Sequence, residues 1–515
     1  MGKRKQWIQL EIHHTVFWVS AGLIIFFVAF TLINPEYMQH VFDTAQGVIT
    51  QKAGWFYILS VNVFLVIVVY LLLSRYGRIR LGGEGALPEF SYLGWLSMLF
   101  SAGMGIGILF YSVAEPVIHY NNPPWGEGGS VESANLAMGV TFFHWGIHAW
   151  GLYALMALGL AYYSFNHKMP LTIRSAFYPL LGKHIHGWMG NVIDILASVS
   201  TLFGLATSLG LGAKQVNAGL NYLTGLPQTN NIQVILIAGI TSMALASVVL
   251  GLDKGIRRLS QANMIFALIL LIFILFVGPT VYIFDSMVQN IGTYIDLLPK
   301  LSMWTDAYHR DNSWQDGWTI FYWAWWIAWS PFVGIFIARI SYGRTIREFV
   351  LNVLLVPTLL TLIWMTVFGN AALFEEMFGA SGIASAVNDN IATALFVLLD
   401  RFPLAVITSA LGVIVLTLFF VSSSDSASLV IDIITAGGFH NPPVIQRVFW
   451  ASTEGIVAAV LLLGGGLQAL QAAVIITGLP FTVVILLLGY SLIKGLRQDF
   501  PDSRNKNRNP YSKTT

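Results

Sequence analysis

The chain has 515 residues, of which 56% are hydrophobic and only 10% are charged, and its mean hydropathy is +0.69. So much apolar surface exceeds what a soluble core of this length can bury, so the lipid bilayer must be the main solvent. The formal net charge of +2 and the lack of a continuous Lys and Arg stripe exclude a nucleic-acid-binding surface. Without cysteine, the chain has no disulfide and no thiolate metal site.

Twelve apolar runs, each long enough to cross the hydrocarbon layer as a helix, follow one another along the chain. Their limits are 15–33, 55–73, 92–113, 136–163, 193–213, 234–250, 262–283, 319–340, 349–368, 404–434, 448–463 and 472–493. The first run is not a secretory signal, because it is long, lacks a small-residue cleavage pattern and is followed by many more. We therefore predict an all-α polytopic membrane protein with twelve transmembrane helices.

Positive charge alternates between the loops of this scheme. The predicted outer segments hold only Lys52, Lys300, Arg310 and Arg401, and Lys214 lies near a membrane boundary. All other Lys and Arg residues fall in the predicted inner segments, as expected of cytoplasmic loops. Both termini are therefore predicted to be cytoplasmic.

The predicted organisation has six parts. Between the seventh and eighth spans, 288–305 is too short and too charged to span, which favours an amphipathic helix along the outer interface. The parts are a cytoplasmic N-terminus 1–14, two peripheral spans 15–75, a first five-span unit 88–285, the interfacial helix 288–305, a second five-span unit 318–493 and a cytoplasmic tail 494–515.

Two spans contain residues that weaken a helix. The third holds Gly103, Gly105 and Gly107, and the eighth holds Pro331 within the run 329–334. At membrane depth, freed backbone groups are tolerated only where protein, water or an ion satisfies them. Interruptions at matching positions, five spans apart, predict two inverted five-helix repeats (spans 3–7 and 8–12) with a binding site between them. The alternative is close helix packing at small residues.

Aromatic side chains gather in the fourth and eighth spans. They are Trp145, Trp150 and Tyr153 in the former and Trp323, Trp326 and Trp329 in the latter. An interfacial aromatic belt is the alternative, but these rings lie well inside their spans. A methylated ammonium donates no hydrogen bond and is attracted to ring faces, at about 2 kcal/mol for each desolvated contact. The cluster therefore predicts a site for a quaternary ammonium.

The tenth span carries four serines and Asp425 between positions 422 and 426. A serine in a membrane helix usually bonds its own helix backbone, but this concentration of oxygen atoms is typical of a functional site. The oxygen atoms suit Na⁺. The pair His144 and His148 invites a metal hypothesis, but no carboxylate accompanies it in the motif, so packing or hydrogen bonding is favoured.

The motifs together resemble those of the betaine/carnitine/choline transporter family. They are the glycine run, Phe-His-Trp-x-x-His-x-Trp-x-x-Tyr, Phe-Tyr-Trp-Ala-Trp-Trp-Ile-x-Trp-Ser-Pro-Phe-Val-Gly, Ala-Arg-Ile-Ser-x-Gly-Arg-Thr-Ile-Arg-Glu and Ser-Asp-Ser-Ala-Ser. The resemblance covers residues 88–493 and implies the inverted-repeat fold of sodium symporters in spans three to twelve. It also implies a homotrimer in the bacterial inner membrane.

The resemblance assigns functions to individual residues. The family's aromatic box falls on Trp145, Trp150, Tyr153 and Trp326, with Trp329 and Phe332 on the substrate path and outer gate. Its principal sodium site falls on the hydroxyls of Ser422 and Ser423 and the carbonyls of Ser101, Met104 and Phe419. A second sodium site uses two threonines, of which the first matches Thr201 and the second is Leu205 here.

Further departures bear on coupling and substrate. Ion-independent carnitine exchangers have arginine and methionine at the positions of Asn263 and Val333, so the residues of this chain favour ion coupling. Choline-selective members have an aspartate in place of Gly107, so glycine favours a zwitterion.

We therefore expect a secondary transporter, not an enzyme, that needs no cofactor. It would import glycine betaine or a related osmolyte with Na⁺ as the coupling ion. A proton-coupled choline or broad-specificity betaine/carnitine carrier of the same family is the alternative. A channel is disfavoured, because no span has a polar stripe along its whole length.

Overall fold

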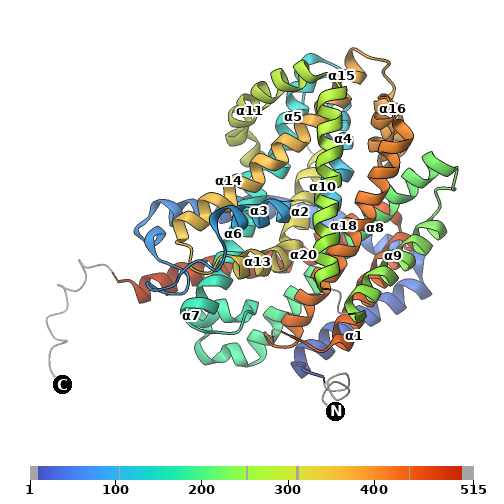
Figure 1. The fold of residues 1–515 in the computed structure, drawn as a ribbon. Helices are drawn as coiled ribbons and strands as arrows, with labels where there is room; N and C mark the ends of the chain where they lie inside the picture. Colours follow the sequence, from blue (N-terminus) through green and yellow to red (C-terminus); the bar gives the residue numbers. More distant parts are fainter. Residues whose placement is uncertain (1–9, 104, 251–252, 309–312, 440, 502–515) are drawn as a thin grey trace, which may run out of the picture.

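The computed structural model describes residues 10–103, 105–250, 253–308, 313–439 and 441–501, and the regular elements in these ranges are helices (Figure 1). The longer ones are α1 (His14–Ile33), α2 (Pro35–Leu73), α3 (Tyr92–Gly103), α4 (Ile106–Asn121), α5 (Val131–Trp145), α6 (Ile147–Ala161), α8 (Trp188–Thr224), α9 (Asn230–Leu250), α10 (Asp253–Val277), α11 (Thr280–Ser302), α13 (Phe321–Ile340), α14 (Ile346–Met365), α18 (Ala405–Thr435), α19 (Val444–Leu463) and α20 (Gly466–Asp499). The predicted all-α class is confirmed. Parts of both predicted cytoplasmic termini, 1–9 and 502–515, lie outside the described residues.

Short helices connect or extend the long ones. The α-helices are α7 (Tyr178–Leu181), α12 (Ser313–Gln315), α15 (Ala371–Met377), α16 (Ile383–Asp389) and α17 (Ala394–Leu399). The 3₁₀ turns are η2 (Arg75–Arg78), η4 (Ile173–Phe177), η5 (Gly182–His186) and η8 (Ile391–Thr393). The π-helical turns are η3 (Tyr162–Asn166), η6 (Asp316–Ile320) and η7 (Thr366–Asn370).

Long apolar helices confirm a multi-pass membrane protein. Within the described ranges, ten helices are long and apolar enough to cross a bilayer, or eleven if the bent pair α3 and α4 counts as one span. Large apolar side chains on them are exposed, among them Phe26 at 69% and Phe276 at 67%, as lipid-facing residues should be. The count of twelve spans stays a prediction.

The third span breaks where the glycines predict it. Helix α3 ends at Gly103, and α4 starts at Ile106 after an extended Gly105, with a bend of 60° between the two helices. The eighth span is not interrupted, which corrects the second predicted break. Helix α13 runs through Pro331, and the hydroxyl of Ser330 donates to the carbonyl of Ile327 at 2.8 Å. This bond satisfies the acceptor that proline leaves without an amide partner.

The fourth span has a break that the sequence analysis did not predict. Helix α5 ends at Trp145, Gly146 adopts a non-helical conformation, and α6 begins at Ile147. The Ile147 amide donates to the Tyr294 hydroxyl at 3.1 Å. A side chain at Gly146 would meet the same hydroxyl at 2.4 Å, so only glycine fits this junction.

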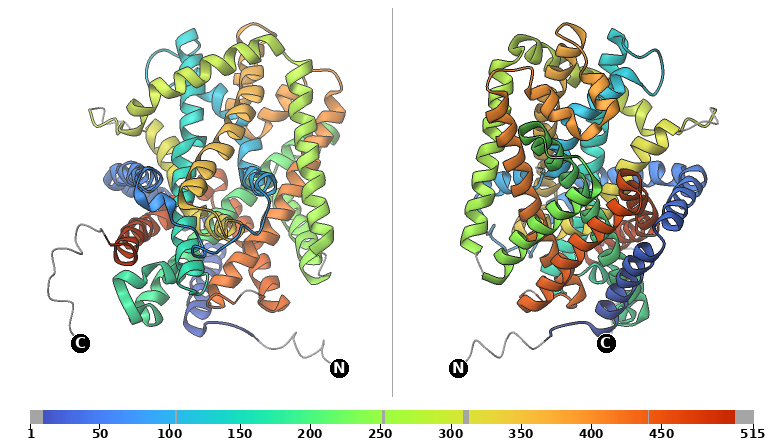
Figure 2. Two further views of the ribbon diagram at one scale, coloured as in Figure 1. Left: turned by 60° about the vertical axis from the view of Figure 1, so that its left-hand side comes forward. Right: turned by 90° about the vertical axis from the view of Figure 1, so that its right-hand side faces the viewer.

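Some predicted boundaries are wrong. The seventh span ends at Val277 rather than at 283, because Gly278 and Pro279 separate α10 from α11. The segment expected to lie along the outer interface, 288–305, falls largely in α11, which starts at Thr280 and exposes an apolar face that includes Val281, at 74%, and Val288, at 77%. This helix lies across the top of the molecule in the left view of Figure 2. Its position at the interface stays a prediction. The second helix begins at Pro35, well before the predicted start at 55.

Segments predicted to lie on the inner side meet one another. The chain after α2 joins the turn after α13. The Leu81 amide donates to the Arg344 carbonyl and the Gly343 amide donates to the Leu81 carbonyl, each at 2.9 Å, and the Arg80 side chain donates to the Gly343 carbonyl at 2.5 Å. The amide of His13 donates to the Thr435 carbonyl at 2.8 Å. These segments lie away from α11 and α15, which are at the top in Figure 1.

The middle of the molecule is built around α13. This helix packs against α6, α8 and α20, while α4 packs against α5 and α8. The helix breaks before α4 and α6 therefore lie beside a continuous, tryptophan-rich helix.

Candidate substrate and ion sites

A cavity of about 530 Å³, the ring cavity, lies between the two helix breaks and α13. Its lining consists of Ala102, Gly105, Ile106, Gly107, Ile108, Trp145, Ala149, Trp150, Tyr153, Ser208, Trp325, Trp326, Trp329, Val333 and Thr361. Among these described residues none is acidic. All four residues of the aromatic box and Trp329 line the cavity, as do Gly105 and Gly107.

Rings from α5, α6 and α13 pack edge to face around this cavity. The Trp145 and Trp326 ring centroids are 5.0 Å apart at 70°, and those of Trp150 and Tyr153 are 5.4 Å apart at 71°. Trp325 stacks on Trp326 at 4.9 Å and 12°. These separations lie within the range that aromatic pairs favour, so the rings brace one another.

Hydrogen bonds fix the indole edges of α13. Trp326 donates its ring N–H to the His144 carbonyl at 3.0 Å, and Trp329 donates to the Gly204 carbonyl at 2.9 Å. A buried indole N–H needs such an acceptor. With the edges held, the orientation of each ring is set before a ligand arrives.

Two tryptophans of α13 are placed differently from the prediction. Trp323 lies against Phe143 and His148, with centroids at 5.2 and 5.7 Å, and is not in the lining of the ring cavity. Trp325, which the sequence analysis passed over, lines the cavity. Trp325 and Trp326 lie four and three residues before Trp329, so each is a helix-surface neighbour of Trp329, and that spacing was a signal from which Trp325 could have been found.

The glycine run permits close packing at the start of α4. A β-carbon at Gly107 would lie 2.7 Å from Trp325 and 3.1 Å from Trp145, which is too close without movement of a ring. Gly105 has open space around it and directs the chain into α4. The first N–H groups of a helix have no partner within the helix. Their presence at the cavity suits a ligand carboxylate.

Four of the five residues of the predicted principal sodium site line a second cavity, the serine cavity, of about 750 Å³. Its lining consists of Ser101, Ala102, Ser260, Asn263, Met264, Trp329, Phe332, Val333, Phe336, Phe419, Ser422, Ser423 and Ser426. It shares Ala102, Trp329 and Val333 with the ring cavity. The Ser422 hydroxyl donates to the Phe419 carbonyl at 3.2 Å. The predicted ligand Met104 lies outside the described residues.

Thr201 lies apart from both of these cavities. Its side chain is buried in α8, and its hydroxyl has no hydrogen-bond partner among the described atoms. Neither lining includes Thr201 or Leu205.

A third cavity, the arginine cavity, continues from the serine cavity. It has a volume of about 1200 Å³ and shares Phe332, Phe336 and Ser426 with the serine cavity. Its lining also includes Arg339, Asn441 and Arg447. The three cavities thus form a series from the aromatic rings to a segment that the charge pattern places on the inner side.

Comparison with known proteins gives the same family as the motifs. The model of the betaine/carnitine/choline family of transporters matches residues 15–501. The chain belongs to this family. A glycine betaine/proline/choline transporter of Vibrio parahaemolyticus is 47% identical, with 95% of this chain and 91% of the relative aligned. A glycine betaine transporter of Acinetobacter baylyi is 46% identical over 95% and 74% of the two chains. Glycine betaine transporter 1 of V. parahaemolyticus is 44% identical over 95% and 94%.

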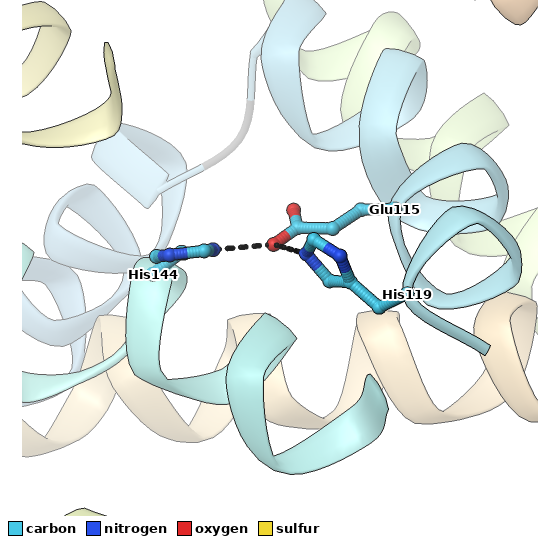
Figure 3. Close-up of side chains that lie close together, drawn as sticks. All are labelled: Glu115, His119 and His144. Carbon is cyan, nitrogen blue, oxygen red and sulfur yellow. Dashed lines mark hydrogen bonds and ion pairs between the residues drawn. The ribbon is translucent and has the colours of Figure 1, made fainter. Parts of the chain in front are cut away.

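A buried carboxylate lies behind the aromatic box of this family member. Glu115 on α4 accepts from Trp145 Nε1 at 2.8 Å and from the Tyr322 hydroxyl at 2.5 Å through one oxygen. Its other oxygen lies 2.6 Å from His144 Nδ1 (Figure 3). His119 Nε2 is 3.4 Å from that second oxygen. We call these five residues the Glu115 network. All are buried.

Glu115, His119 and His144 have the residue types of a metal site, and their ligand atoms lie within 4.8 Å of one another. However, two ligands of a tetrahedral Zn²⁺ would be about 3.3 Å apart, given Zn–N bonds near 2.0 Å. The 2.6 Å between His144 and Glu115 is instead the length of a charge-assisted hydrogen bond. The geometry therefore favours a hydrogen-bond network over a metal centre.

The histidine pair of the fourth span does not form one site. His144 contacts Glu115 and, through Nε2, the Thr319 hydroxyl at 3.0 Å. His148 Nε2 lies 3.2 Å from the side-chain Oδ1 of Asn62 and 3.1 Å from the Ser302 hydroxyl. The expected hydrogen-bonding role is confirmed for both. The sequence analysis missed Glu115, because it is 29 residues from His144 and only the packing of α4 on α5 brings them together.

Proposed function

We propose that this chain imports glycine betaine, or a closely related quaternary-ammonium or zwitterionic osmolyte, by sodium symport. The observation that carries the proposal is the ring cavity, with four box rings and no acidic residue in its described lining. Each desolvated ring contributes about 2 kcal/mol toward a methylated ammonium. Several rings can therefore hold the cation without a carboxylate in direct contact.

The substrate's own negative charge has a partner in the same cavity. The start of α4, where the first N–H groups of a helix have no partner within the helix itself, lies at the cavity beside Gly105 and Gly107. A zwitterion of betaine size can place its ammonium among the rings and its carboxylate at this helix start. The names of the relatives agree with such a substrate, and one of them also includes proline and choline.

Sodium coupling rests on the serine cavity. Ser422 and Ser423 line it and carry hydroxyls, and Ser101 and Phe419, whose carbonyls are the other expected ligands, belong to the same lining. Hard cations prefer such oxygen ligands. One inward charge crossing 100 mV releases about 2.3 kcal/mol, so two sodium ions would supply about 4.6 kcal/mol for accumulation of a neutral solute.

The cavity series supports alternating access from an inward-facing arrangement. We place the arginine cavity on the cytoplasmic side, because Arg339 and Arg447 belong to the segments that the charge pattern assigns there. We also place both termini on the cytoplasmic side. The proposal further includes twelve spans in the bacterial inner membrane, inverted repeats formed by spans 3–7 and 8–12, and assembly as a homotrimer.

The test is uptake of radiolabelled glycine betaine into proteoliposomes, with external Na⁺ replaced by K⁺ at fixed pH. We expect uptake in Na⁺ and almost none in K⁺. Uptake that ignores Na⁺ but follows an imposed pH gradient would favour the alternative, a proton-coupled carrier. Competition by unlabelled choline, proline, ectoine and carnitine would then rank substrates. Absence of betaine binding and uptake would refute the proposal.

A further inference from the structure

The Glu115 network touches the aromatic box from behind. One carboxylate oxygen of Glu115 accepts from the indole N–H of Trp145, whose ring lines the cavity. The same oxygen accepts from Tyr322, whose ring lies 5.7 Å from Trp326 and 5.6 Å from Trp145. A single carboxylate therefore anchors one ring of the box directly and contacts a second through Tyr322.

The other carboxylate oxygen is also occupied. His144 Nδ1 approaches it at 2.6 Å, and Thr319 lies 3.0 Å from the opposite nitrogen of that ring. With a proton on Nδ1, His144 donates to Glu115 and accepts from the Thr319 hydroxyl, so the whole chain of bonds is satisfied with a neutral imidazole. In this state the bonded chain Thr319–His144–Glu115 carries one negative charge, on Glu115.

A charge in this position acts on the rings. Cation–π attraction is electrostatic and depends on the negative potential of the ring face. An indole that donates its N–H to an anion is polarised toward greater electron density in the ring, and polarisation is strong where the dielectric constant is low. The carboxylate therefore strengthens the attraction between the indole ring and a cation on the opposite side of the ring, although the carboxylate and the cation are not in contact.

We propose that Glu115 is the counter-charge of the substrate's ammonium and a positioning residue for the aromatic box, acting through Trp145 and Tyr322. This inference rests on the proposed function, since it requires a quaternary ammonium in the ring cavity. It explains why a carboxylate is held in the membrane interior with no direct access to that cavity. Intramembrane carboxylates are costly and are typically retained for function.

Two substitutions separate charge from shape. Glu115→Gln keeps the length: its carbonyl can still accept from Trp145 and Tyr322, and its amide can donate to His144 after a change of tautomer. Only the negative charge is lost. Glu115→Asp keeps the negative charge but moves it away from Trp145 and Tyr322, because the side chain is shorter by one methylene group. Thr319→Val is the matched control, since Thr319 lies outside the five residues of the Glu115 network, is hydrogen-bonded among them to His144 alone, and its replacement leaves Glu115 and both of its ring donors in place.

The measurement is the Kd of glycine betaine by titration calorimetry on purified full-length protein in saturating Na⁺, with thermal melts to establish folding. We expect Glu115→Gln to weaken binding about tenfold, which corresponds to about 1.4 kcal/mol. Glu115→Asp should weaken binding less than Glu115→Gln, and Thr319→Val should stay within about twofold of wild type, because neither removes the charge.

Other results overturn the inference. Wild-type affinity in Glu115→Gln, or a loss in Glu115→Asp that equals or exceeds the loss in Glu115→Gln, would mean that shape matters and charge does not. If Glu115→Gln does not fold, Trp145→Phe replaces it in the test, because this variant keeps an aromatic ring but removes the N–H that is donated to Glu115. Wild-type affinity for betaine in Trp145→Phe would also refute the inference. Failure of the wild-type protein to bind betaine would instead refute the proposed function, so the two failures are distinguishable.

Discussion

Replacement of Trp326 by alanine is the most direct test of the ring cavity. The side chain is only 7% exposed, its ring packs against Trp145 and Trp325, and it lines the cavity. Loss of one desolvated cation–π contact removes about 2 kcal/mol of binding free energy. That corresponds to about a thirtyfold rise in the Kd of glycine betaine. Because the neighbouring rings lose their support as well, we expect at least this effect.

The same substitution also creates a void, so stability must be measured separately. Truncation of a buried tryptophan lowers the free energy of unfolding by about 3–5 kcal/mol. Trp323→Ala is the matched control: Trp323 belongs to the same helix, is 1% exposed and is absent from the lining of the ring cavity. Its thermal stability should fall by a similar amount while its affinity for betaine stays near wild type.

The assay is calorimetric titration of both variants with glycine betaine, beside uptake into proteoliposomes. The reasoning would be refuted if Trp326→Ala bound betaine within about threefold of wild type, since a contact worth about 2 kcal/mol would then be missing. Equal losses of affinity in the two variants would show that general loosening of α13 is responsible.

Three further predictions concern ion coupling, packing and pH. Ser423→Ala should raise the Na⁺ concentration needed for half-maximal uptake, whereas Ser423→Thr, which keeps the hydroxyl, should not; equal Na⁺ curves for all three proteins would remove Ser423 from the site. Gly107→Ala places a β-carbon 2.7 Å from Trp325, so overpacking should lower stability by about 1–3 kcal/mol and weaken betaine binding, and an unchanged melt and Kd would contradict this. Burial and the nearby Arg174 lower the pKa of His13, so the neutral form is favoured in the folded protein. The contribution of neutral His13 to the free energy of unfolding is therefore present above the unfolded pKa of about 6.5 and is lost as pH falls below it. His13→Gln should therefore reduce the fall in melting temperature between pH 7.5 and 5.5, and identical pH profiles would count against this role.

The helices were predictable because the bilayer imposes a simple rule on composition. Runs such as 15–33 and 448–463 are apolar over the length of a span, and α1 and α19 follow them closely. The glycine run likewise marked the bend before α4, since glycine lowers the cost of leaving the helix. Local composition was sufficient in these cases.

Hydrogen bonds between groups whose partners depend on the tertiary structure were less predictable. Pro331 suggested a break, but whether proline breaks a membrane helix depends on what satisfies the freed carbonyl, and here the adjacent Ser330 does so. Gly146 gave little warning of the break in the fourth span, because the stabilising Tyr294 comes from a distant helix. Glu115 was missed for the same reason: its partners come from α5 and α13.

The backbone bonds between residues 79–81 and 343–346 constrain how the transporter can move. Ile79 and Leu81 accept from Ile346 and Gly343, so the end of α2 is fastened to the turn that follows α13. If α13 tilts during the transport cycle, the segment bonded to its C-terminal turn must either move with it or act as the point about which it rotates. The segment that follows α2 is thus linked to the helix that carries most of the cavity's indoles, so a displacement of one is transmitted to the other.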